Sequence, residues 1–374
     1  MRGLVLSGGG ARGAYQVGVL RAVGHICQDL GMKNPFKIIT GVSAGAINAG
    51  KIAERCDDFP IAAEELTDLW SHLHSEQVFK TDPVSMGRIG LQWLGELSIG
   101  GLTGSAGGRS LLDTSPLRTL IDSNLDFSKV ETRIREGALH ALGITAMDYR
   151  NSTTITFLQG SEKIALWERA RRKSEKARLR TEHILASSAI PLLFPPVAVD
   201  HRYFGDGCIR NLAPCSPALH LGANKLLVIG VRKHNMTADE KLAVKTPGPP
   251  SVARVANVLL NSVMLDGIEA DIERLQRINT FMTQVPEAHH EALNFRSVPF
   301  LFISPTEDIG LMASKMANKL PRVVRYLLKG LGPLEDASEL ISYLLFEPEF
   351  CRQLIDLGYR DGMSKKDELV AFLS

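Results

Sequence analysis

The sequence has few cysteines, few aromatic residues and almost no net charge. Its 374 residues include five cysteines, and no two of them form a C-x-x-C pair. They are Cys27, Cys56, Cys208, Cys215 and Cys351. Because their number is odd and their spacing wide, they favour neither a disulfide framework nor a cysteine zinc site, and we expect reduced thiols. A formal net charge of +2 disfavours a polycation that coats nucleic acid.

Long hydrophobic runs are also missing. Only Leu4-Val5-Leu6 precede the first glycine run, which is too short for the apolar region of a secretory signal. No stretch approaches the roughly 18 apolar residues of a membrane span. We therefore expect a cytoplasmic protein, and any membrane contact would be peripheral. Hydrophobic residues at 44% and charged residues at 22% are typical of a folded globular chain.

Strands and helices are predicted to alternate along the chain. Apolar runs bounded by turn residues predict strands at 3–6, 36–40, 142–147, 153–158, 225–231 and 299–305. Helical spacing predicts helices after the first two strands, at 58–82, at 252–278 and over most of the last sixty residues. This order indicates an α/β fold with a central, mostly parallel sheet flanked by helices. We expect one α/β domain over 1–310 and a helical C-terminal extension, 311–374, packed on it.

A glycine-rich turn follows the first predicted strand. Gly8-Gly9-Gly10-Ala11-Arg12-Gly13 matches the G-x-G-x-x-G pattern, but the second strand ends without the acidic residue that a dinucleotide site needs. The alternative is an oxyanion hole, because successive glycines let several backbone N–H groups point into one concavity at the start of a helix. Arg12 would add positive charge or brace the loop.

A second glycine turn follows the second strand. Gly41-Val42-Ser43-Ala44-Gly45 has the G-x-S-x-G pattern and the strand-turn-helix setting of a nucleophile elbow. Gly41 and Gly45 would remove side chains that clash with the tight turn, leaving the Ser43 hydroxyl exposed. In a parallel sheet the carboxyl ends of strands face one crevice, so we expect the two glycine turns to meet.

The serine needs a base, and none of the ten histidines lies in a catalytic motif. Asp206 in Tyr203-Phe204-Gly205-Asp206-Gly207 is the candidate, because the glycines allow close backbone approach and the aromatic rings could exclude water. Aspartate is a weak base, so this role requires desolvation that raises its pKa. Taken alone, the Asp-Gly pair is equally typical of an ordinary turn.

Together with Ala186-Ser187-Ser188-Ala189-Ile190-Pro191, these motifs resemble the patatin-like phospholipase family in order and approximate spacing, over about residues 1–235. The resemblance implies a Ser–Asp dyad with Ser43 as nucleophile and Asp206 as base, supported by Gly207. It implies an oxyanion loop of Gly8, Gly9, Gly10 and Arg12, a pocket wall at 186–191, and no metal or cofactor. Cys208 stands where the family usually has glycine or alanine; it is small enough to fit, although it could crowd the turn or be oxidised.

The activity implied by the resemblance is hydrolysis of carboxylic esters in phospholipids or lysophospholipids, of the phospholipase A or lysophospholipase type. An acyltransferase would use the same dyad, with an alcohol in place of water. A non-catalytic lipid-binding descendant is the third interpretation. Intact Ser43, Asp206 and glycine loop argue against it, since a binding module needs none of them.

Two segments are candidates for peripheral membrane contact. Residues 168–180 hold seven cations and two anions and could form an exposed helix against anionic headgroups, or only a solvated charged face. Residues 85–108 combine glycines with apolar side chains, as a flap over an apolar site or a packed connection would. No aromatic residues interleave with the cations, which disfavours nucleic-acid binding. Neither oligomeric state nor headgroup preference has a signal in the sequence.

Overall fold

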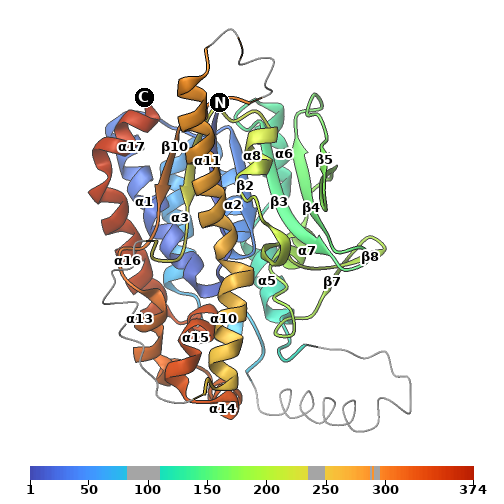
Figure 1. Ribbon diagram of the computed structural model, residues 1–374, viewed down its shortest axis with the longest axis vertical. Coiled ribbons are helices and arrows are strands. Elements are labelled where there is room, and N and C mark those ends of the chain that lie inside the picture. Colours follow the sequence, from blue (N-terminus) through green and yellow to red (C-terminus); the bar gives the residue numbers. More distant parts are fainter. Residues whose placement is uncertain (82–109, 235–248, 287–288, 290–294) are drawn as a thin grey trace.

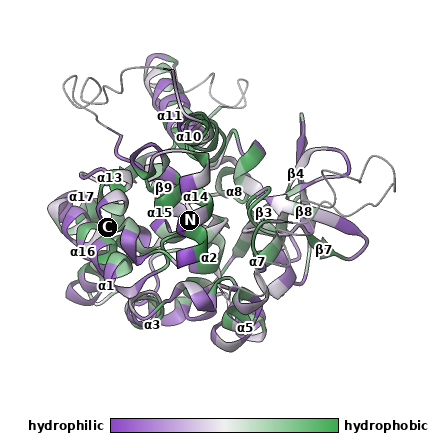
Figure 2. Cartoon of the chain, turned by 90° about the horizontal axis from the view of Figure 1, so that it is seen from below, coloured by the Kyte–Doolittle hydropathy of each residue, from purple (hydrophilic) through white to green (hydrophobic). Residues whose placement is uncertain are grey.

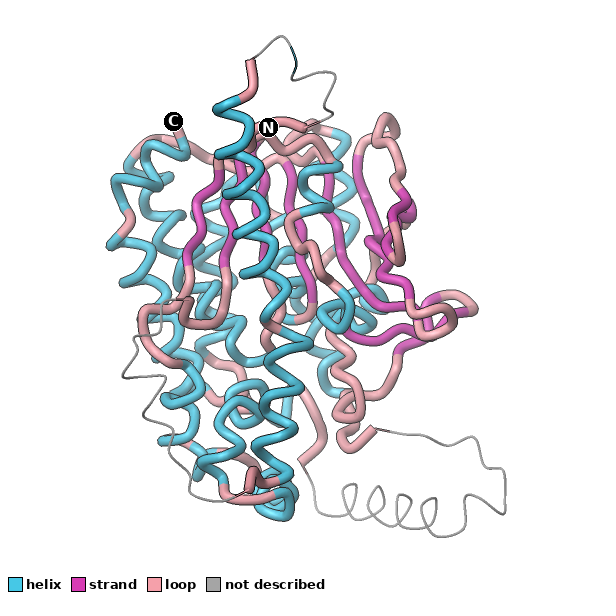
Figure 3. Tube along the Cα trace, viewed as in Figure 1, coloured by secondary structure: helices cyan, strands magenta, loops and turns pink. Residues whose placement is uncertain are grey.

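A computed structural model gives the fold and describes residues 1–81, 110–234, 249–286, 289 and 295–374. One mixed sheet lies between layers of helices (Figures 1 and 3). This arrangement confirms the predicted α/β class with a mostly parallel central sheet and a helical C-terminal region.

The parallel part of the sheet has the order β10-β9-β1-β2-β3, and β4 then continues antiparallel to β3. A short hairpin, β7–β8, pairs with β3 through β8, and β6 and β5 complete the far edge. The strands are β1 (Arg2–Leu6), β2 (Ile38–Val42), β3 (Ala141–Asp148), β4 (Thr153–Gly160), β5 (Glu168–Arg169), β6 (Arg172–Lys176), β7 (Val197–Val199), β8 (Arg202–Asp206), β9 (Lys225–Ile229) and β10 (Phe300–Ile303).

Alternating strand residues enter two separate cores. Leu4 and Leu6 of β1 belong to the larger core, whereas Val5 between them belongs to the smaller one. Apolar residues on both faces are expected of a strand covered on both sides. The described α-helices are α1 (Gly13–Asp29), α2 (Ala44–Glu54), α3 (Phe59–Ser71), α5 (Ser115–Asn124), α6 (Phe127–Arg135), α7 (Thr181–Ser187), α8 (Ser216–His220), α10 (Val252–Met264), α11 (Asp266–Gln284), α13 (Ile309–Lys315), α14 (Arg322–Leu331), α15 (Ser338–Leu344), α16 (Pro348–Ser364) and α17 (Lys366–Leu373).

The C-terminal helices pack directly on the N-terminal ones. Helix α16 lies along α1, where Gly18 and Gly358 let the two backbones approach so closely that a Cβ at either glycine would overlap the other helix. The proposed division into 1–310 and 311–374 stays a prediction. Within the described residues, no helix is long and apolar enough to cross a lipid bilayer.

Three sequence predictions need correction or qualification. The charged segment 168–180 is not a helix: β5 and β6 form a hairpin, and the backbone of β6 pairs with β4 at the sheet edge, where Ser174 is buried opposite Thr156. Within the hairpin, the Ser174 hydroxyl accepts a hydrogen bond from the Trp167 N–H at 2.9 Å. The predicted helix 252–278 is two helices, α10 and α11, that meet at Leu265. The helix predicted over 58–82 ends at Ser71. The segment 85–108 lies outside the described residues.

Candidate active site

Ser43 stands at the sharp turn between β2 and α2. Its φ of 56° and ψ of −130° are rare for a residue with a side chain. The flanking glycines make the turn possible, since a Cβ at Gly41 would overlap the Gly45 carbonyl and a Cβ at Gly45 would overlap the carbonyls of Leu6 and Ser7. Helix α2 therefore starts directly above the ends of β1 and β2, as the elbow motif predicts.

The strained turn is held by hydrogen bonds from helix α7. The Ser43 N–H donates to Ser187 Oγ at 2.9 Å, and the Ser187 hydroxyl donates to the Thr145 carbonyl of β3 at 2.6 Å. The predicted pocket wall at 186–191 thus also fixes the elbow backbone, a role that no motif in the sequence indicated.

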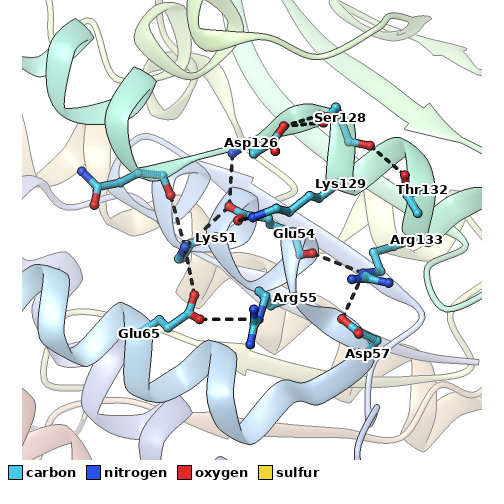
Figure 4. Close-up of polar contacts among 11 residues, drawn as sticks. Lys51, Glu54, Arg55, Asp57, Glu65, Asp126, Ser128, Lys129, Thr132 and Arg133 are labelled. Carbon is cyan, nitrogen blue, oxygen red and sulfur yellow. Dashed lines mark hydrogen bonds and ion pairs between the residues drawn. The ribbon is translucent and has the colours of Figure 1, made fainter.

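The far end of α2 is anchored by a network of ion pairs (Figure 4). Glu54 is almost fully buried and binds Lys129 of α6 at 3.0 Å and Lys51 at 3.6 Å, and it also accepts a hydrogen bond from the Asp126 N–H at 3.2 Å. Since α2 begins next to Ser43, fixing its other end limits how far the elbow can shift.

Strand β3 brings Asp206 to Ser43. Strand β2 ends at Val42, which pairs with Thr145 of β3, and β8 ends at Asp206, which pairs with the next β3 residue, Ala146. Strand β2 is parallel to β3 and β8 is antiparallel to it, so the two strands run toward each other along the same side of β3. Their ends meet, although they are far apart in the sequence.

Asp206 is completely buried at this junction. Its N–H donates to the Ala189 carbonyl at 2.8 Å, and its Oδ1 accepts the Cys208 N–H at 2.9 Å. Its Oδ2 has no hydrogen-bond partner among the described residues. Burial raises the pKa of Asp206 to about 6, whereas the Ser43 hydroxyl and the Cys208 N–H oppose that rise by favouring the carboxylate. The Ser43 hydroxyl therefore lies close enough to this carboxyl to favour its ionised form.

Gly207 and Cys208 shape the turn after Asp206. A Cβ at Gly207 would overlap the Thr145 carbonyl, so only glycine lets β8 end this close to β3. The buried Cys208 sulfur fills the space beside Gly8, where a Cβ would overlap both this sulfur and the Ser43 Cβ. Burial raises the pKa of the Cys208 thiol well above its ordinary value, which keeps it in the less reactive thiol form.

The glycine loop lies beside the elbow, because a Cβ at Gly8 would overlap the Cβ of Ser43. Gly10 has a φ of 57°, and a Cβ there would overlap the Tyr343 carbonyl of α15. Gly10 also lines the pocket that contains Ser43. Two helices begin here, α1 after the loop and α2 after Ser43, so their positive ends favour a negative charge at this point.

Arg12 braces this loop from behind. Its guanidinium is buried, donates from Nε to the Ser342 hydroxyl at 2.8 Å, and forms an ion pair with Glu339 through Nη2. It also lies over the Tyr343 ring, 5.1 Å from its centroid. All three partners belong to α15, so the C-terminal helices support the glycine loop, and no local motif marked them.

An apolar pocket opens beside Ser43. Ser188 and Ile190 of the 186–191 segment lie on its wall, with Trp70 and Phe346 among the rings around it. The other lining residues include Ile47, Leu69, Leu73, Val78, Leu117, Leu120 and Phe194. The cavity measures about 30 Å³, enough for one or two water molecules, so a longer group can enter only if the side chains around it move.

The fold and this site define an α/β protein with a serine elbow that faces a buried aspartate beside a glycine loop. The family model of the patatin-like phospholipases matches residues 4–219, and the chain belongs to this family. Membership places it among lipid hydrolases. The crystal structure of VipD from Legionella pneumophila aligns at 13% identity with a TM-score of 0.37, over 98% of this chain and 67% of that one. A search of curated proteins gives no match.

Proposed function

We propose that the chain is a serine lipid acyl hydrolase of the phospholipase A or lysophospholipase type, with Ser43 as nucleophile and Asp206 as general base. The proposal rests above all on the junction of β2 and β8. There a serine in a strained turn faces a fully buried carboxylate whose Oδ2 has no partner among the described residues.

The first step is attack by Ser43 Oγ on the ester carbonyl carbon, while Asp206 accepts the hydroxyl proton. A pKa near 6 leaves Asp206 ionised at neutral pH yet more basic than an exposed aspartate. The negative oxygen of the tetrahedral intermediate would receive N–H groups of the Gly8–Gly10 loop. Removing one such donor typically costs about 2.7–4 kcal/mol of transition-state stabilisation.

Collapse of the intermediate returns the Asp206 proton to the leaving alcohol and leaves an ester on Ser43. Water then attacks the carbonyl carbon of this acyl-enzyme, and Asp206 again accepts the proton. Collapse of the second intermediate breaks the bond to Ser43 Oγ, which takes the proton back from Asp206, and the fatty acid leaves. The apolar pocket beside Ser43 suits the acyl chain, because its walls offer almost no polar partners and would hold a hydrocarbon by excluding water.

Two variants test the dyad. Ser43→Ala and Asp206→Asn should each abolish release of fatty acid from phospholipid and lysophospholipid, with unchanged circular dichroism. A fluorophosphonate probe should label the wild type and the surface control Ser161→Ala, but not Ser43→Ala. A folded Ser43→Ala protein with wild-type turnover would refute the proposal. Product analysis with an added alcohol acceptor separates hydrolysis from acyl transfer.

A further inference from the structure

Helix α10 has an exposed face that is almost entirely apolar. Val252, Val255 and Leu259 recur at helical spacing and are 65%, 46% and 61% exposed, and Val258 and Val263 extend the same surface. Arg254 is the only charged residue in the helix. An aliphatic face of this length in water is costly and marks an interaction surface.

Helix α14 extends this surface and adds positive charge. Tyr326 is 76% exposed, and Leu327 and Leu331 are also exposed. Arg322 and Lys329 lie on the same ten-residue helix, which contains no acidic residue. Neither of these two cations forms an ion pair with any residue that the structure describes, and the third cation of the helix, Arg325, donates to the Asn318 carbonyl at 2.8 Å. Apolar side chains, an exposed tyrosine and unpaired cations on one helix are typical of elements that lie in a membrane interface.

The two helices form one continuous surface, which we call the α10–α14 face. Helix α14 packs against α10, and Gly332, directly after α14, lies so close to Ser251 and Ala253 that a Cβ there would contact both. Figure 2 views the molecule from the end where these helices lie. The parallel strands run toward this end from the amino terminus, so Ser43 at the end of β2 lies on the same side (Figure 1).

The α10–α14 face also adjoins the pocket. Arg322 at the start of α14 shares a surface cleft with Ser75 and Glu347. Val78 follows Ser75 by one helical turn, and Phe346 directly precedes Glu347. Both Val78 and Phe346 line the pocket of Ser43. A flat partner seated on α14 would therefore lie near the side of the pocket that Val78 and Phe346 line.

We propose that the α10–α14 face docks on the surface of an anionic phospholipid bilayer. The inference builds on the proposed function, because a lipid hydrolase must meet a substrate that is held in an aggregate. Headgroup phosphates would neutralise Arg322 and Lys329, and the aliphatic side chains would enter the acyl boundary. The β5–β6 hairpin suits this role less, because it offers little apolar surface and Lys173 is already paired with Glu175.

The proposal can be tested by sedimentation with vesicles of phosphatidylcholine containing phosphatidylglycerol. All proteins have the Ser43→Ala change, so that no lipid is consumed. One variant adds Leu259→Glu and Leu327→Glu, and a second adds Arg322→Glu and Lys329→Glu. The control adds Leu166→Glu, which makes one of the same leucine-to-glutamate changes at an exposed position outside this face. Apart from Ser43, all substituted residues are exposed at the surface, and thermal unfolding verifies the folds.

We expect both face variants to bind the vesicles about tenfold more weakly or worse, and the control to bind like its parent. When the same face substitutions are made in the protein that retains Ser43, the variants should hydrolyse a monomeric short-chain ester normally and vesicle lipid poorly. Parent-like vesicle binding by the face variants would overturn the proposal, as would a parent that forms a dimer through this face and ignores vesicles. If the wild type does not hydrolyse the monomeric ester, the proposed function is refuted, and the vesicle-binding result still stands.

Discussion

Replacing Asp206 with asparagine should stabilise the fold while removing activity. The carboxyl is completely buried, and its Oδ2 has no hydrogen-bond partner among the described residues. Asparagine has the same shape, its oxygen can still accept the Cys208 N–H, and its amide can donate toward the Ser43 hydroxyl. The substitution therefore removes a buried charge without opening a cavity.

The size of the effect follows from the pKa of Asp206, which burial raises from 3.8 to about 6. The folded protein thus holds this proton more tightly than the unfolded chain, so the contribution of the group to stability falls as pH rises from about 3.8 to about 6. Each tenfold change in proton affinity is worth about 1.4 kcal/mol. The cost of the ionised group is then about 2 kcal/mol at pH 5 and about 3 kcal/mol at pH 7.5.

Urea unfolding at pH 5 and at pH 7.5 measures this difference. The free energy of unfolding of Asp206→Asn should exceed that of the wild type at both values, and its advantage should grow by about 1 kcal/mol between them. Asp148→Asn is the matched control, because Asp148 is equally buried but paired with Arg202 at 3.3 Å, so its neutralisation should destabilise the fold. A less stable Asp206→Asn, or an advantage that ignores pH, would refute the reasoning.

Further predictions concern the same site. Turnover of a monomeric ester should rise with pH through about 6 and then level off, because the base must be ionised; constant activity from pH 5 to 7 would exclude Asp206 as base. Arg12→Met should lower the free energy of unfolding by about 1–3 kcal/mol, since it removes the hydrogen bond to the buried Ser342 hydroxyl and leaves the partly buried Glu339 without its cation; urea unfolding measures it, and a loss below 1 kcal/mol would contradict the brace. N-ethylmaleimide should not inactivate the native protein, because every cysteine is buried; rapid inactivation would contradict this burial. Gly45→Ala should cost about 1–3 kcal/mol in the same unfolding assay, because its Cβ meets the Leu6 carbonyl.

Local patterns were sufficient for the strands that lie in the middle of the sheet. Residues 3–6 and 225–231 are short apolar runs bounded by turns, and they become β1 and β9 in the buried centre. The strand within residues 168–180 could not be predicted from such a local pattern. Its charges suit an exposed helix, and only pairing with β4, a contact between elements, makes β6 a strand. Leu265, where α10 ends, interrupts a helical pattern that has neither proline nor glycine before it.

The candidate site was predictable where its residues lie in motifs. The glycines around Ser43 and after Asp206 fit turns that tolerate no side chain, so their spacing points to the backbone geometry directly. The contacts of Arg12 with α15 span more than three hundred residues, and a single sequence shows no pattern that links such distant positions. The support of the Ser43 N–H by Ser187 is of the same kind.

Strand β3 fixes the distance between the end of β2 and the end of β8, because both strands pair with it. Two consecutive β3 residues, Thr145 and Ala146, set the separation between hydroxyl and carboxyl. Insertions in the long connection from Ser43 to Asp206 can therefore change the surface of the enzyme without altering that separation. A single residue inserted into β3 at this point would alter it at once.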